Sequence, residues 1–168
     1  DETLMQDLIN QVDYIYHLAA AVGVKYIMDN PLESIKTNAR GVEIVLELAS
    51  QEKKRILIAS SSEVYGKDGK VPDKESGDRL MGAASTHRWS YASTKAFGEF
   101  LALAYWYDQQ LPVVIVRLFN TSGARQTGQY GMVIPRFVEL ALMGEPITIY
   151  GDGTQSRCFT DVLDATEA

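Results

Sequence analysis

The chain has 168 residues, of which 46% are hydrophobic and 23% charged, a composition typical of one soluble globular domain. Its net charge of −6 argues against a broad nucleic-acid surface, which needs a basic patch. The only cysteine, Cys158, cannot form an intrachain disulfide and has no partner at metal-ligand spacing, and no apolar run reaches the ~20 residues of a membrane span. We therefore expect a cytoplasmic protein that binds no metal, membrane or nucleic acid.

Strand and helix signals alternate along the chain. Proline at position 31 suits the first turn of a helix, and apolar residues then recur at helical spacing. Short apolar runs without such spacing predict buried strands. The expected order is a helix end at 4–10, a strand at 13–20, a helix at 32–50, a strand at 55–60, a loop at 66–90, a helix at 91–107, a strand at 112–119, a loop at 120–132, a helix at 133–143 and a strand at 147–150.

Apolar strands separated by amphipathic helices indicate an α/β fold with a doubly wound parallel sheet and helices on both faces. In open sheets of this kind, ligands bind beyond the carboxyl ends of the strands. Three groups of residues are expected there, namely His17-Leu-Ala-Ala20, Ser60-Ser-Ser-Glu63 and Leu118-Phe-Asn120. Their convergence predicts a site at this edge of the sheet.

Tyr91 and Lys95 are four residues apart on a predicted helix and therefore lie on one face. An ammonium beside a phenol favours the phenolate, so we expect Lys95 to lower the pKa of Tyr91. A phenol with a lowered pKa becomes a usable general base near neutral pH.

Several candidate residues also have a purely structural interpretation. Ser61 can cap the end of a strand, Glu63 can be a solvated loop carboxylate, and Asn120 can form a turn. Arg157 can be a surface charge, and His17 can be a packed histidine. Two other site types are excluded, because the sequence has neither the Gly-x-Ser-x-Gly elbow of a hydrolase nor a P-loop.

Taken in chain order, these motifs resemble a known family. They are His17-Leu-Ala-Ala20, Asn38, Ser60-Ser-Ser-Glu-Val-Tyr-Gly66, Tyr91-x-x-x-Lys95, Arg117-Leu-Phe-Asn120, Tyr150-Gly-Asp-Gly153 and Arg157. The set resembles the extended short-chain dehydrogenase/reductases, in particular the NAD-dependent nucleotide-sugar epimerases and dehydratases, such as UDP-glucose 4-epimerase.

The resemblance implies roles for individual residues. Tyr91 would take a proton from the sugar 4-hydroxyl while hydride passes to NAD, with Lys95, Ser61 and Glu63 completing the catalytic set. The implied cofactor-binding residues are Ala19, Ala20, Asn38, Ser60, Tyr91, Lys95 and Leu118. The implied substrate-binding residues are Ser61, Ser62, Asn120 and Arg157, the last two at the pyrophosphate, where a guanidinium suits bidentate contact.

The residue before Glu63 bears on the reaction type. In the dehydratases that the chain resembles, an Asp-Glu pair occupies this place, whereas this chain has Ser62. Ser-Ser-Glu resembles the decarboxylases and some epimerases more closely, so a 4,6-dehydratase is the less favoured member of the family.

The sequence contains no glycine-rich dinucleotide turn followed by an acidic residue about 20 positions later. We therefore expect residues 1–168 to form a single domain without the N-terminal βαβ unit. It would comprise the C-terminal half of a Rossmann-like domain and the start of a substrate-binding lobe. The strand at 13–20 would then be an exposed edge, which favours self-association. The resemblance implies a homodimer through helices 32–50 and 91–107.

Three hypotheses for function remain open. The first is a nucleotide-sugar epimerase that oxidises the sugar at C4 with NAD. The second is a truncated relative that acts at most as a binding or assembly module. The third is a decarboxylase or 4,6-dehydratase on the same scaffold. The identity of the nucleotide and sugar is left open.

Overall fold

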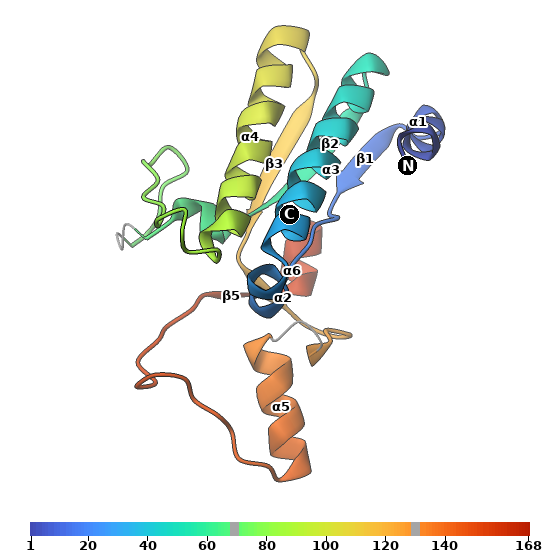
Figure 1. Ribbon diagram of the computed structural model, residues 1–168. Helices are drawn as coiled ribbons and strands as arrows, with labels where there is room; N and C mark the ends of the chain where they lie inside the picture. The colour runs from blue at the N-terminus through green and yellow to red at the C-terminus, as the bar shows by residue number, and fades with distance from the viewer. Residues whose placement is uncertain (68–70, 129–131) are drawn as a thin grey trace.

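The computed structural model describes residues 1–67, 71–128 and 132–168 (Figure 1). Strands and helices alternate over most of this length, as the sequence pattern predicts. The elements are α1 (Glu2–Asn10), β1 (Tyr14–His17), α2 (Val24–Asp29), α3 (Pro31–Gln51), β2 (Arg55–Ser61), the 3₁₀ turn η1 (Ser62–Tyr65), α4 (Trp89–Gln109), β3 (Val113–Leu118), β4 (Asn120–Ser122), α5 (Val133–Met143), β5 (Phe159–Asp161) and α6 (Val162–Glu167).

The main sheet has three parallel strands in the order β1-β2-β3. Ile15 pairs with Ile56, which pairs with Val113 in turn. Helix α3 connects β1 to β2, and α4 connects β2 to β3. This arrangement confirms the predicted parallel α/β fold and brings the carboxyl ends of all three strands to one edge.

Helices α3 and α4 lie side by side against one face of the sheet (Figure 1). Their facing side chains and the strand residues on that face form the hydrophobic core, in which Leu46 and Ala102 are completely buried. The N-terminal end of α4, with Tyr91 and Lys95, thereby lies beside the carboxyl end of β2. The core thus fixes the catalytic candidates of the helix against those of the strand.

The opposite face of the sheet is open in the part of the chain that the structure describes. Tyr14, Tyr16 and Val114 project from it and are 56%, 68% and 56% exposed. The predicted helix cover on both faces is therefore observed on one face only. Strand β1, which pairs only with β2 among the described residues, is the predicted sheet edge, but it ends at His17 and is shorter than expected.

The C-terminal part differs from the expectation. The predicted strand at 147–150 is wrong, because this segment is irregular and its Ile149 and Tyr150 side chains are 63% and 68% exposed. No strand lies beside it within the described residues to accept its backbone hydrogen bonds. Instead, β4, in a segment predicted to be a loop, pairs with β5 in a small parallel sheet. Helix α2 was also not predicted.

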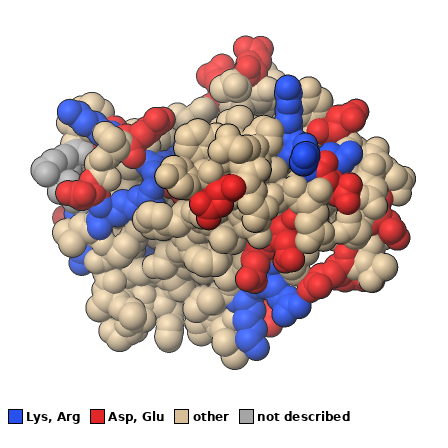
Figure 2. Space-filling model, turned by 90° about the horizontal axis from the view of Figure 1, so that it is seen from above, with Lys and Arg blue, Asp and Glu red and all other residues tan. Residues whose placement is uncertain are grey.

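Charged side chains of both signs are interspersed on the face shown in Figure 2, with broad uncharged areas between them. Among the described helices, none is long and apolar enough to cross a bilayer.

Candidate active site

A cavity of about 450 Å³ lies at the carboxyl ends of the sheet strands. It is lined by side chains from β2, η1, the first turns of α4, and the segments that follow β1 and β3. Of the residues predicted from sequence, the cavity brings together Ala20, Ser60, Ser61, Ser62, Glu63, Tyr91, Lys95, Leu118 and Asn120. These come from four segments of the chain, and parallel strand order is what makes them neighbours.

Tyr91 and Ser61 form the centre of this arrangement. Ser61 is the last residue of β2, and Tyr91 lies in the first turn of α4. Burial raises the pKa of Tyr91, an interaction of its hydroxyl with Ser61 lowers it, and the negative charge of Glu63 raises it further, with a net increase. The phenol is therefore protonated at neutral pH in this state.

Lys95 lies one helical turn beyond Tyr91. Its Nζ is 5.8 Å from the Tyr91 ring centroid and donates a hydrogen bond of 2.6 Å to the carbonyl oxygen of Ala59. Burial lowers the pKa of Lys95. The expected lowering of the Tyr91 pKa by Lys95 is thus not seen here, because burial of the phenol is the largest influence on that pKa and Lys95 is bonded to the Ala59 carbonyl.

Glu63 is held at the rim of the cavity. Its backbone N–H donates to Ser61 Oγ at 3.3 Å, so Ser61 caps the N-terminus of η1. Its carboxylate lies 3.6 Å from Arg88 Nη2, and both side chains are partly exposed. Such a long and exposed pair is weak, so the Glu63 carboxylate and the Arg88 guanidinium are both accessible from the cavity.

Two of the predicted cofactor-binding residues lie elsewhere. Asn38 is buried on α3, where its Oδ1 accepts from the Ala21 N–H at 2.7 Å and its Nδ2 donates to the Ala21 carbonyl at 3.2 Å. Asn38 therefore shapes the loop after β1 and does not line the cavity. Ala19 lines a neighbouring cavity together with His17, while Ala20 lines both.

The two predicted pyrophosphate contacts behave differently. Asn120 lines the cavity, although its Nδ2 donates to the Cys158 carbonyl at 2.8 Å and so ties β4 to the segment before β5. Arg157 is exposed, does not line the cavity, and donates to the Ser156 carbonyl at 2.7 Å. The structure therefore does not bring Arg157 into the site.

His17 ends β1 beside the site. Burial lowers the pKa of His17, and the positive charge of Lys95 lowers it further. The imidazole is consequently neutral at pH 7. No cluster of acidic, histidine and cysteine side chains suited to a metal ion occurs in the ranges 1–67, 71–128 and 132–168.

Sequence reasoning missed Arg88 and Glu99. Arg88 precedes Tyr91 by three residues and Glu99 follows Lys95 by four, so the face of α4 that carries the candidate residues extends one turn in each direction. That spacing was a usable signal for both residues. The segment 66–90 was interpreted as a loop, which hid the position of Arg88 at the beginning of the helix.

Comparison with known proteins identifies the family that the sequence motifs resemble. The model of the NAD dependent epimerase/dehydratase family matches residues 1–168. The UDP-N-acetyl-alpha-D-glucosaminuronate decarboxylase of Bacillus cytotoxicus is 50% identical over 169 residues, which cover 100% of this chain and 52% of the relative. The chain thus spans about half the length of this curated relative.

Solved structures share the fold. The UDP-glucuronic acid 4-epimerase of Bacillus cereus, solved with UDP-glucuronic acid and NAD, is 30% identical with a TM-score of 0.83, covering 98% of this chain and 51% of that one. The UDP-glucose 4-epimerase of Thermotoga maritima, solved with UDP-glucose, is 26% identical with a TM-score of 0.90, covering 99% and 54%.

Proposed function

Because the chain belongs to the NAD dependent epimerase/dehydratase family, we propose that it carries the catalytic face of an enzyme that oxidises the 4-hydroxyl of a nucleotide-linked sugar. The observation that supports this most directly is the meeting of Tyr91, Lys95 and Ser61 in one cavity. We also propose that residues 1–168 form a single domain, which comprises the C-terminal half of a Rossmann-like domain and the start of a substrate-binding lobe. The proposed location of the protein is the cytoplasm. The truncated-module hypothesis remains the alternative for the 168-residue chain by itself.

In this proposal Tyr91 removes the proton from the sugar 4-hydroxyl, and Ser61 Oγ hydrogen-bonds the same oxygen. NAD, when bound, supplies the acceptor for the hydride that leaves C4. Lys95 contributes a positive charge beside the phenol, although it is tied to Ala59 in the present state. Since the Tyr91 pKa is raised here, proton removal requires additional positive charge or a shift of Lys95 toward the phenol oxygen.

The residues present fit the reactive end of NAD. Ala20 and Leu118 give the cavity apolar walls suited to a nicotinamide ring, and Lys95 offers a partly buried donor beside them. Ser60, in contrast, is bonded to Glu99, so its part in cofactor binding is indirect. We expect the pyrophosphate-binding turn to come from residues outside this sequence, as the partial coverage of the relatives suggests.

We further propose that the sugar is a uronic acid joined to UDP. Oxidation at C4 places the ketone β to the C6 carboxylate, so the C5–C6 bond can break with release of carbon dioxide and formation of an enolate. Protonation at C5 restores the C4 ketone, and return of the hydride to C4 makes the overall reaction redox-neutral. Glu63, at the cavity rim beside Tyr91, is suited to handle that proton. The curated relative named above as a decarboxylase supports this outcome, and the UDP-glucuronic acid 4-epimerase supports 4-epimerisation as the second candidate.

Product analysis separates these outcomes. The protein, as the 168-residue chain and as the whole protein if its gene encodes a longer one, is incubated with NAD and either UDP-glucuronic acid or UDP-N-acetylglucosaminuronic acid. Decarboxylation predicts a product lighter by one carbon dioxide, and epimerisation predicts a product of unchanged mass. Calorimetry with NAD tests the truncated-module alternative, since no binding at millimolar NAD would exclude independent catalysis by the short chain.

We also propose a homodimer through the outer faces of α3 and α4. Phe100, Trp106 and Tyr107 on α4 are 68%, 53% and 76% exposed, which is unusual for large apolar side chains close together on one helix. Light scattering at micromolar concentration is expected to give a dimer, and Phe100→Glu to give a monomer. A monomeric wild-type protein would rule this assembly out. The open edge at β1 is the second route to self-association that we predict.

A further inference from the structure

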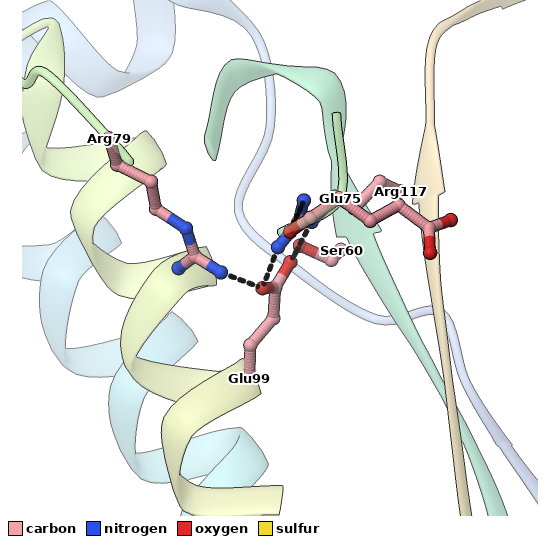
Figure 3. A network of polar contacts seen from close by, with 5 residues as sticks. All are labelled: Ser60, Glu75, Arg79, Glu99 and Arg117. Carbon is pink, nitrogen blue, oxygen red and sulfur yellow. Dashed lines mark hydrogen bonds and ion pairs between the residues drawn. The ribbon is translucent and has the colours of Figure 1, made fainter. Parts of the chain in front are cut away.

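Glu99 lies on α4, one turn beyond Lys95, and is only 3% exposed. Figure 3 shows its carboxylate at the centre of a polar network. One oxygen, Oε1, accepts from Ser60 Oγ at 2.5 Å and from Arg117 Nε at 2.9 Å. The other, Oε2, accepts from Arg79 Nη2 at 2.6 Å and from Arg117 Nη2 at 2.8 Å. The carboxylate therefore connects β2, β3 and the loop before α4.

The network holds both ends of the short segment that contains the catalytic serine. At one end, Ser60 is bonded to Glu99. At the other end, the Arg117 guanidinium stands over the Tyr65 ring at 4.7 Å, within the range of a cation–π contact. Residues 61–63, with both candidate hydroxyls and the candidate carboxylate, lie between these two fixed points. Their position relative to Tyr91 thus depends on the Glu99–Arg117 pair.

The same carboxylate also anchors the loop that leads from η1 to α4. Arg79 belongs to this loop and pairs with Glu99, and Arg117 Nη1 donates to the Glu75 carbonyl at 3.3 Å. Farther along, Lys67 N–H donates to the Leu80 carbonyl at 3.0 Å, which closes the base of the loop. The mostly buried Glu99–Arg117 pair therefore stabilises the cavity rim that η1 and the beginning of α4 form.

Electrostatics agree with this geometry. Burial alone raises the pKa of Glu99, but hydrogen bonds from Arg117 and Ser60 and the charges of both arginines outweigh burial and lower it. Glu99 is therefore ionised at neutral pH. Removing its charge would leave two guanidinium groups, both mostly shielded from solvent, without their carboxylate.

We propose that Glu99 is a positioning residue that, through Ser60 and Arg117, sets the placement of residues 61–63 against Tyr91. The expected effect on turnover rests on the proposed function, whereas the expected effect on the position of residues 61–63 does not. Glu99 is not among the residues that line the cavity, so any effect on the reaction has to pass through its partners. Its effect is transmitted by the two ends of the segment.

The test is Glu99→Gln, which preserves size and removes the charge, in the same protein forms used for product analysis. We expect kcat to fall about 10- to 100-fold, since a misplacement of ~1 Å can cost 10²-fold, while KM changes by less than about 3-fold. Amide hydrogen exchange is expected to speed up at 61–65 and 79–82 and not in the core of β3. The matched control is Glu2→Gln, which breaks an equally short but exposed ion pair with Arg40 and should change neither measurement.

Each result is decisive. Unchanged exchange at 61–65 in Glu99→Gln would overturn the inference even if the wild-type protein shows no turnover, so the inference can fail separately from the proposed function. Faster exchange with unchanged kcat would overturn its catalytic part. If Glu99→Gln does not fold, Arg117→Lys replaces it, because lysine keeps the charge but loses the paired donors. Arg117→Lys should also lower kcat with little change in KM. If its kinetics and its amide exchange both match the wild type, the positioning role is refuted.

Discussion

Lys95 Nζ donates a hydrogen bond of 2.6 Å to the carbonyl oxygen of Ala59, two residues before Ser61. This bond ties the helix that carries the candidate base to the strand that carries the candidate serine. An ammonium bonded to a carbonyl of the neighbouring strand is also fixed at a defined distance from Tyr91. The bond holds the ammonium near the phenol, while burial keeps the pKa of Tyr91 above its ordinary value in this state.

Tyr91→Phe is expected to lower turnover by at least about 100-fold, the usual contribution of a positioned general base or acid. The fold should be retained, because only a hydroxyl is removed from a ring whose packing is unchanged. Turnover and far-ultraviolet circular dichroism are the measurements. Tyr107→Phe, on the same helix but exposed, is the control and should match the wild type. Full activity in Tyr91→Phe would refute the mechanism.

Lys95→Met is expected to abolish turnover without reducing the free energy of unfolding at pH 7. Burial lowers the pKa of Lys95 in the folded state, which means that the fold disfavours the charged ammonium. At a pH below that pKa, methionine, a neutral side chain of similar length, removes the free-energy cost of burying the charge. Urea unfolding at pH 7 measures the difference. A clear loss of stability would mean that the bond to Ala59 outweighs the cost of burying the ammonium.

His17 predicts a pH dependence of stability. The pKa of His17 in the folded state lies below its ordinary value of 6.5. The contribution of the neutral imidazole to the free energy of unfolding is therefore fully present above pH 6.5 and is lost as the pH falls through the folded-state pKa. Thermal unfolding between about pH 7.5 and about pH 5 should show this decline, because imidazoles titrate there. His17→Gln should flatten the curve, whereas His87→Gln should leave it unchanged. Equal curves for wild type and His17→Gln would contradict the assignment.

Asn38→Ala is expected to cost about 1–3 kcal/mol, because it leaves the partly buried backbone N–H and carbonyl of Ala21 without their partners. Urea unfolding measures this loss, and limited proteolysis should show faster cleavage in the loop after β1. Lys36→Ala on the exposed side of α3 is the control, with a change within about 0.5 kcal/mol. A similarly small change in Asn38→Ala would show that the loop holds its shape without the amide.

Local signals in the sequence predicted which candidate side chains would lie together at the carboxyl ends of the strands. The four-residue spacing of Tyr91 and Lys95 fixes them on one helical face, and the apolar run before Ser61 identifies the strand that ends there. Parallel strands then require that their carboxyl ends converge. The cavity with Ser61, Tyr91, Lys95 and Asn120 follows from those rules without any knowledge of distances.

What the sequence could not provide depends on contacts between distant segments. The apolar run at 147–150 has the composition of a strand, but a strand forms only beside a partner strand. The available partner, β4, pairs with β5 instead. Likewise, nothing local distinguishes Arg157, which lies on the surface, from Arg117, which is held by Glu99. Pairing of charges is a property of the packed fold and not of the residues one at a time.

The sequence by itself determined the α/β architecture and the family, because periodicity and motif spacing are encoded along the chain. Only the tertiary structure decided that Asn38 braces a loop, that the Tyr91 pKa is raised and that Glu99 joins three segments. Each of these depends on burial and on partners that are far apart in sequence. Desolvation and hydrogen bonding between such partners exist only once the helices have packed on the sheet.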